Sequence, residues 1–82
     1  MTLTAIILID VDPPLTDAVY NQLKGHPDVK EVSSVYGIHD IFLLITVPDE
    51  ESLNEFVFSV LRPTEGIKET LTLMVTRTLR KN

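Results

Sequence analysis

The most restrictive feature of the sequence is an apolar run from Ile41 to Val47, which only Thr46 interrupts. A half-exposed strand alternates apolar and polar residues, because neighbouring side chains point to opposite faces. A continuous apolar run therefore predicts a strand that is covered on both faces. The run is too short to cross a membrane as a helix, which takes about 20 apolar residues. Which segments cover these two faces has to be inferred from the rest of the sequence.

Hydrophobic periodicity and turn residues divide the chain into strands and helices around this run. Asp12-Pro13 and Pro48-Asp49 are typical helix starts, because aspartate caps a helix and proline tolerates its first turn. In order, the expected elements are a strand at 3–11, a helix from Asp12-Pro13 to near Gly25, a strand at 29–36, the apolar strand at 41–47, a helix from 48–51 to 62–66 and a long strand at 67–79.

The two halves of this pattern resemble each other. Val29-Lys30-Glu31 recurs as Ile67-Lys68-Glu69 at a shift of 38 residues, and apolar helix positions match at the same shift. A duplicated βαβ unit with right-handed crossovers predicts an α+β fold, the ferredoxin-like βαββαβ sandwich. That fold has a four-stranded antiparallel sheet with two helices on one face. Its central strands are the first and third, which here are the two near-continuous apolar strands.

The predicted fold leaves one face of its sheet without a cover. This face carries Phe42 and Leu44 or, in the alternative register, Ile41 and Leu43. Either pair is apolar, and an exposed apolar patch of this size usually marks an interface. A twofold dimer that packs sheet against sheet is the simplest closed solution, so we expect a homodimer.

Composition narrows the class of protein. Eighty-two residues predict one domain over 1–82, and 44% hydrophobic residues leave apolar surface for oligomerisation. Seven Lys and Arg face twelve Asp and Glu, for a formal net charge of −5. The one cationic cluster is the tail with Arg77, Arg80 and Lys81, which we interpret as a solvated terminus. We therefore expect no direct DNA binding.

The sequence offers little for catalysis. It has no cysteine and no basic region of a signal peptide at its start, which predicts a cytoplasmic protein without disulfides. His39 adjoins Asp40, but adjacent strand residues point to opposite faces and seldom act together. The glycines are isolated, and the acidic residues lack the spacing of a metal loop. We expect no enzyme activity, no metal, no cofactor and no membrane association.

Two features remain that can hold a small ligand. The turn from Gly37 to Asp40 combines backbone amides with a carboxylate, and a stripe of threonines lies on one face of the last strand, at Thr70, Thr72, Thr76 and Thr78. A free amino acid needs a carboxylate for its ammonium group and amides or hydroxyls for its own carboxylate. The structural interpretation has the advantage from the residues alone, because glycine and aspartate form turns and threonine favours edge strands.

The stretches VYGIHDIFLLITV and EGIKETLTLMVTRTL resemble the C-terminal effector domain of the Lrp/AsnC regulators, also called the RAM domain. That family shows a Val-x-Gly-x-x-Asp turn before its third strand, matched by Val35, Gly37 and Asp40. It also shows a glycine, a branched apolar residue and spaced threonines at the start of its fourth strand, matched by Gly66, Ile67, Thr70 and Thr72. The resemblance covers essentially the whole chain.

The resemblance implies dimers that pair through their sheets, assemble further into an octamer or decamer and bind amino acids between dimers. In such a site Asp40 would accept from the ligand's ammonium group, and backbone amides near Gly37 would face its carboxylate. Threonines of the fourth strand would line the site from a neighbouring protomer. The implied ligand-binding residues are Tyr36, Gly37, Ile38, Asp40, Thr70 and Thr72.

Members of this family usually carry a helix-turn-helix domain before the effector domain, whereas the first strand here starts at about Leu3. We therefore expect a stand-alone amino-acid-sensing regulatory and oligomerisation domain that can associate with a full-length regulator. Two alternatives stay open. One is a purely structural oligomerisation module, and the other is a small dimeric α+β-barrel enzyme with His39 or Asp40 as its base.

Overall fold

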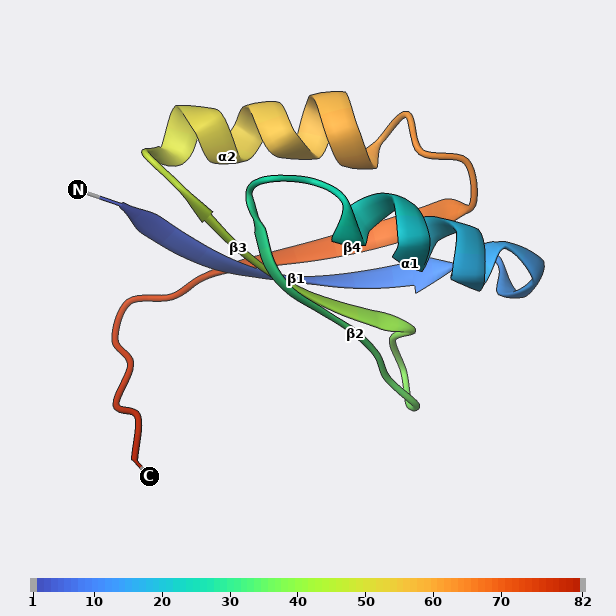
Figure 1. The fold of residues 1–82 in the computed structure, drawn as a ribbon, viewed down its shortest axis with the longest axis horizontal. Helices are drawn as coiled ribbons and strands as arrows, with labels where there is room; N and C mark the ends of the chain where they lie inside the picture. The colour runs from blue at the N-terminus through green and yellow to red at the C-terminus, as the bar shows by residue number, and fades with distance from the viewer. Residues whose placement is uncertain (1, 82) are drawn as a thin grey trace.

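A computed structural model describes residues 2–81 of the chain as one sheet with helices on one side (Figure 1). The order of strands and helices is the predicted βαββαβ. The elements are β1 (Leu3–Val11), the 3-10 turn η1 (Pro13–Leu15), α1 (Thr16–Lys24), β2 (Val29–Ser34), β3 (Ile41–Val47), α2 (Glu50–Phe56), its π-helical continuation η2 (Val57–Leu61) and β4 (Ile67–Met74).

The four strands form one antiparallel sheet in the order β2-β3-β1-β4. The two apolar strands, β1 and β3, therefore lie at the centre, and β2 and β4 lie at the edges. Central strands have neighbours on both sides and exclude water best, which suits their continuous apolar sequences. The ferredoxin-like fold predicted from the sequence is confirmed.

One face of this sheet forms the core with the helices. Every second residue of β1 from Ala5 on, and of β3 from Ile41 on, points to it and is buried, and the antiparallel register places Ile7 opposite Leu43. From the helices, Val19 and Leu23 of α1 and Phe56 of α2 complete the core. The other fully or nearly fully buried apolar residues are Ala5, Ile9, Val11, Ile41, Ile45, Val47, Leu53 and Leu61.

The two helices begin differently. Asp12 makes no side-chain cap hydrogen bond, and the 3-10 turn η1 precedes α1, so the predicted start of the first helix at Asp12-Pro13 is wrong by three residues or more. Asp49 caps α2, because its Oδ1 accepts a hydrogen bond of 2.8 Å from the backbone N–H of Ser52. This hydrogen bonding from Ser52 lowers the pKa of the Asp49 carboxyl. Between η2 and β4 the chain turns at Gly66, whose φ is 101° and where an added Cβ would lie 2.8 Å from Cβ of Leu15. Glycine at this position lets the turn pack against α1.

The opposite face of the sheet carries a second apolar layer that no helix covers. We call it the open face. Ile6 lies opposite Leu44, and Leu8 lies opposite Phe42, so the register that places Phe42 and Leu44 on the open face is the one observed. On β4, Leu71 and Leu73 extend this layer and remain 48% and 45% exposed.

The last strand is shorter than predicted. β4 ends at Met74 rather than Leu79. Its pairing with β1 ends at Ala5–Met74, and Leu3, the first residue of β1, lies opposite position 76, so β1 offers no strand partner for residues 77–79. The backbone N–H of Val75 donates to the Thr4 carbonyl at 2.9 Å, and after this bond the chain leaves the sheet. Residues 75–81, which we call the arm, extend away from α2 (Figure 1). No helix in the described part of the chain is long and apolar enough to span a bilayer.

Candidate functional site

The predicted ligand turn, Gly37 to Asp40, is part of a longer turn at residues 35–40, because β2 ends at Ser34 rather than Tyr36. This turn connects β2 to β3, and its backbone fixes it to the end of β1. The N–H of Val35 donates to the carbonyl of Asp40 at 2.9 Å, which closes the turn. The N–H of Asp40 donates to the carbonyl of Ile9 at 3.0 Å. The base of the turn therefore has a defined position relative to the central strand of the sheet.

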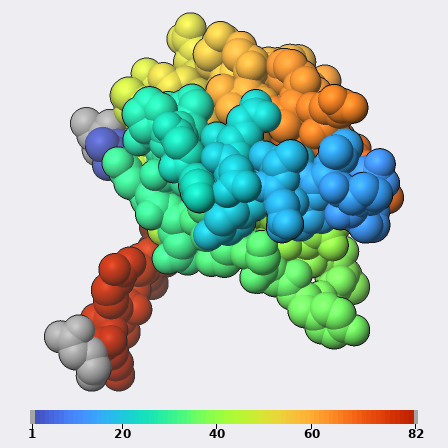
Figure 2. Space-filling view, turned by 45° about the vertical axis from the view of Figure 1, so that its right-hand side comes forward, coloured from blue at the N-terminus to red at the C-terminus, as the bar shows by residue number. Residues whose placement is uncertain are grey.

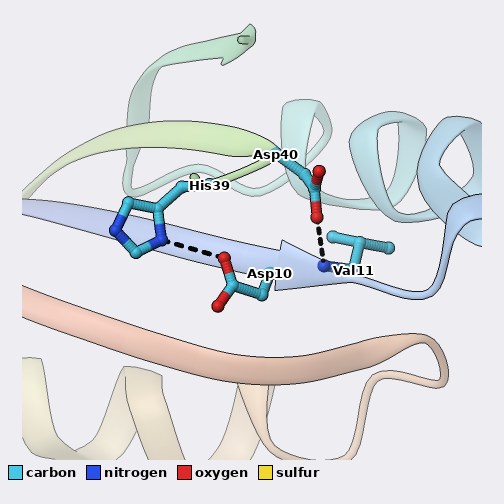
Figure 3. A network of polar contacts seen from close by, with 4 residues as sticks. All are labelled: Asp10, Val11, His39 and Asp40. Atoms are coloured by element: carbon cyan, nitrogen blue, oxygen red, sulfur yellow. Dashed lines mark hydrogen bonds and ion pairs between the residues drawn. The ribbon is translucent and has the colours of Figure 1, made fainter. Parts of the chain in front are cut away.

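Side chains add two further contacts between the turn and β1 (Figure 3). The Oδ2 atom of Asp40 accepts a hydrogen bond of 2.8 Å from the backbone N–H of Val11. The β1–β3 ladder ends at the pair Ile9–Ile41, so Val11 has no strand partner on that side. The carboxylate of Asp40 takes the place of the missing carbonyl, and such charged hydrogen bonds contribute about 1.5–3 kcal/mol.

His39 and Asp40 point to different partners, as the alternation of side chains predicted. The Nδ1 atom of His39 lies 2.8 Å from Oδ1 of Asp10 in β1, and both side chains are about one quarter exposed. Asp10 is not among the residues predicted from the sequence. The available signal was its position, because it is the one charged residue within the apolar strand β1. Glu69 lies opposite Asp10 on β4, which makes this corner of the open face acidic.

The tip of the turn projects from the molecule. Tyr36 and Ile38 are 106% and 90% exposed, and Gly37 between them has a φ of 152°, a value that favours glycine. Figure 2 shows this tip as the green projection at the lower right. The turn thus exposes an aromatic and a branched apolar side chain to water, while its base has a defined position. Such side chains are suited to contact with another molecule.

Thr70 and Thr72 do not reach this turn within one protomer. In β4 they lie opposite Ile9 and Ile7, so they share the helix side of the sheet, and Thr70 is exposed. Asp40 lies on the other side of β1, so two strand spacings of roughly 5 Å each separate the two positions. The threonine stripe is also divided: Thr76 and Thr78 belong to the arm, not to β4.

Within residues 2–81, the two side chains named for the enzyme alternative, His39 and Asp40, contact β1 at the end of the sheet. His39 lies at the rim of the sheet, and the space between sheet and helices is filled by the buried apolar core. A hollow of about 550 Å³ does lie beside α2, lined by His26, Asp28, Glu55 and Phe56 among others. Within residues 2–81 no three His, Asp or Glu side chains are placed to hold a metal ion.

The fold and the turn together define an α+β domain of one class: a ferredoxin-like sandwich with an open apolar sheet face and a fixed turn at its rim. The family model for the Lrp/AsnC ligand binding domain matches residues 4–82. The chain therefore belongs to the Lrp/AsnC family, as the resemblance of its motifs predicted.

Relatives and solved structures agree with this assignment. An uncharacterized HTH-type transcriptional regulator of Pyrococcus horikoshii is 34% identical over 74 residues, which cover 90% of this chain and 47% of the relative. A counterpart in Pyrococcus furiosus is 35% identical, with 90% of this chain and 50% of the relative covered. The chain thus spans about half the length of the curated relatives it matches.

Among solved structures, TTHA0845 from Thermus thermophilus superposes with a TM-score of 0.89 at 30% identity, covering 96% of this chain and 99% of that one. A transcriptional regulator of Neisseria meningitidis, solved in complex with L-Met, has a TM-score of 0.88 at 17% identity. That alignment covers 96% of this chain and 53% of the regulator, and it establishes a shared fold.

Proposed function

We propose that this chain is an amino-acid-sensing regulatory and oligomerisation domain, which binds a small effector between subunits. The observation that carries the proposal is the fixed turn at residues 35–40, which presents Tyr36 and Ile38 to solvent beside an open apolar sheet face. Membership of a ligand-binding family supports it. So does the Neisseria meningitidis regulator of the same fold that was solved with L-Met.

Assembly is the first part of this function. The open face carries Leu44, Phe42 and their neighbours in an apolar layer that a second copy of the chain can cover. A twofold dimer closes this interface on itself, and the exposed turns and threonines then remain outside it for contacts between dimers. An octamer or decamer built from such dimers would place the turn of one dimer near strand β4 of another.

The effector site is the second part. Asp40 uses Oδ2 for Val11, but a carboxylate has about four lone-pair sites and keeps capacity for the ammonium group of an amino acid. Backbone amides near Gly37 face the ligand's carboxylate, and Tyr36 and Ile38 cover it. Because Asp40 and Thr70 flank β1 on opposite sides, Thr70 and Thr72 come from a neighbouring protomer.

Regulation is the third part. The chain matches about half of HTH-type regulators, so a full-length relative carries a domain with a similar open face. Hetero-association with such a regulator would pass the effector signal to its DNA-binding domain. With a net charge of −5, the chain itself contributes no direct DNA binding.

Calorimetry with a panel of the common amino acids tests the effector site. We expect at least one to bind the wild type, and Asp40→Asn to bind it roughly ten- to a hundredfold more weakly because a charged hydrogen bond is lost. Asparagine still offers Val11 a carbonyl oxygen, so the turn is retained. Asp49→Asn, an exposed helix cap away from the turn, is the control and should bind normally.

A purely structural module is the second candidate, and the Asp40–Val11 hydrogen bond favours it, since that bond already accounts for an aspartate in the turn. It forecasts a different result. No amino acid would bind or shift the melting temperature of the wild type, and Asp40→Asn would change stability alone. That outcome would contradict the sensing role.

A further inference from the structure

The arm, residues 75–81, leaves the sheet on the side of the open face. Its first residue, Val75, is still bonded to Thr4, and the chain then continues without strand or helix (Figure 1). In Figure 2 the arm forms the red projection at the lower left, apart from the body of the molecule. The arm therefore extends toward the space that a second subunit on the open face would occupy.

A hollow of about 860 Å³ separates the arm from the sheet. The sheet contributes Ile6, Leu44 and Glu31 to its lining, and the arm contributes Leu79 and Arg80 among others. Leu79 is 80% exposed. The exposed side chain of Leu79 contributes little hydrophobic stabilisation within its own subunit. Packing against a partner would remove its apolar surface from water.

The charge of the arm is opposite to that of the body. All twelve acidic residues and four of the seven cations lie in residues 1–74, so four minus twelve leaves that part at −8. The remaining cations, Arg77, Arg80 and Lys81, give the end of the chain a charge of +3. Three acidic residues of the strands lie on the open face. Asp10 and Glu69 lie opposite each other, and Glu31 lies opposite Leu44.

The arm is also long enough to reach a partner. Seven extended residues span about 23 Å, at about 3.3 Å per residue. Two sheets packed face to face lie only about 10 Å apart. An arm directed toward the partner sheet is thus longer than the layer between the sheets, so it must continue along the partner's side.

We propose that the arm is exchanged between two copies of this chain. Each arm crosses the edge of the inter-sheet layer, buries Leu79 against the partner, and places Arg77 and Arg80 near carboxylates of the partner's edge strands, Glu31 or Glu69. The partner that receives the arm is a second copy of this chain, because this chain itself carries the apolar open face, the hollow and the charges that complement the arm. The inference rests on the sheet-to-sheet dimer of the proposed function.

Disulfide trapping tests the exchange directly, because the chain has no cysteine of its own. An affinity-tagged Leu79→Cys chain is mixed with an untagged Glu31→Cys or Glu69→Cys chain and oxidised without any amino acid present. We expect a covalent product that contains one tagged and one untagged chain with at least one of the two partners. Glu55→Cys, exposed on α2 on the helix side, is the matched control and should give none. Absence of mixed product with both partners would overturn the exchange.

Truncation after Thr76 gives an independent measurement, since it keeps the Val75–Thr4 bond. We expect the dimer to dissociate about tenfold or more readily, as loss of the contacts of one leucine alone corresponds to that factor. Arg77→Glu with Arg80→Glu should weaken the dimer in the same direction, whereas Lys24→Glu on α1 should not. A truncated chain that dimerises as tightly as the wild type would contradict the proposal.

Calorimetry on the same samples keeps the two proposals apart. If the arm exchange fails while amino acids still bind, the sensing role stands without it. If the trapped product forms but no amino acid binds, the exchange stands and the sensing role fails.

Discussion

The two faces of the sheet have similar sequences and different surroundings. Ile7 and Leu43 point to the helices and are completely buried, whereas Ile6 and Leu44, one residue along each strand, point to the open face and stay partly exposed. Intrinsic hydrophobicity does not distinguish these pairs. The difference shows that one chain supplies a cover for only half of the apolar surface that its central strands carry, and it makes the open face the natural assembly surface.

The largest expected effect is the difference in stability between two alanine substitutions at neighbouring positions of β3. We expect Leu43→Ala to reduce the free energy of unfolding by about 2–5 kcal/mol, because it leaves a cavity in the closed core. Leu44→Ala should cost less under conditions that dissociate the protein, since its side chain is partly exposed in one subunit. Chemical denaturation of both variants measures the difference. Equal losses in the dissociated state would contradict the assignment of the two faces.

Introducing a charge on the open face should separate folding from assembly. We expect Leu44→Lys to fold as a monomer, because the ammonium group reaches water in one subunit but would be buried and unpaired in the dimer, at a cost of about 3–5 kcal/mol. Circular dichroism checks the fold and sedimentation velocity checks the mass. A Leu44→Lys protein that assembles like the wild type would place the interface elsewhere.

The two glycines with positive φ differ in their surroundings, as the two faces of the sheet do. Gly66 packs against Leu15 and Val19 of the helix layer, whereas an added Cβ at Gly37 would meet no atom within 4 Å. We expect Gly66→Ala to lower the free energy of unfolding by more than the roughly 1–3 kcal/mol that backbone strain alone costs. Gly37→Ala should cost the strain only, and thermal unfolding should rank the two variants in this order. The reverse order would contradict the tight contact between the Gly66 turn and α1.

The smallest expected effect concerns the cap of α2, which is far from both the open face and the turn. Hydrogen bonds from Ser52 lower the pKa of Asp49 below its ordinary value of 3.8. The contribution of this ionised cap is therefore complete above about pH 5 and declines as the pH falls through the lowered pKa. Asp49→Ala should slightly destabilise the protein at pH 7. The difference should shrink toward the acid end of the titration, where the protonated carboxyl keeps only a neutral hydrogen bond to Ser52. A constant difference down to that end would rule out the charged cap as the cause.

The element pattern and the sheet order could be predicted because they follow from local rules. The apolar run in β3, the helix start at Pro48-Asp49 and the duplicated unit were sufficient. Asp12-Pro13 indicated where the chain turns into its first helix, but a 3-10 turn without a side-chain cap stands there and α1 begins at Thr16. The end of β4 could not be predicted, because it depends on the register with β1. Threonines favour a strand up to Leu79, but the pairing ends at Ala5–Met74, and Leu3, the first residue of β1, lies opposite position 76.

The candidate site was predictable in part. The sequence indicated Gly37 and Asp40 as parts of one turn, but not that the Asp40 carboxylate bonds the N–H of Val11, which lies 29 residues away along the chain. The His39–Asp10 contact spans the same separation. Contacts of this kind depend on the register between β1 and β3, which a hydrophobic pattern restricts to two alternatives but does not choose.

The molecular mass of the wild-type protein in solution tests the central claim, that a second copy covers the open face. Light scattering at micromolar concentration and moderate salt gives this mass without any label or variant. We predict at least twice the 9.2 kDa of one chain, with larger multiples if the dimers assemble further. A stable species of 9.2 kDa under these conditions would contradict the account.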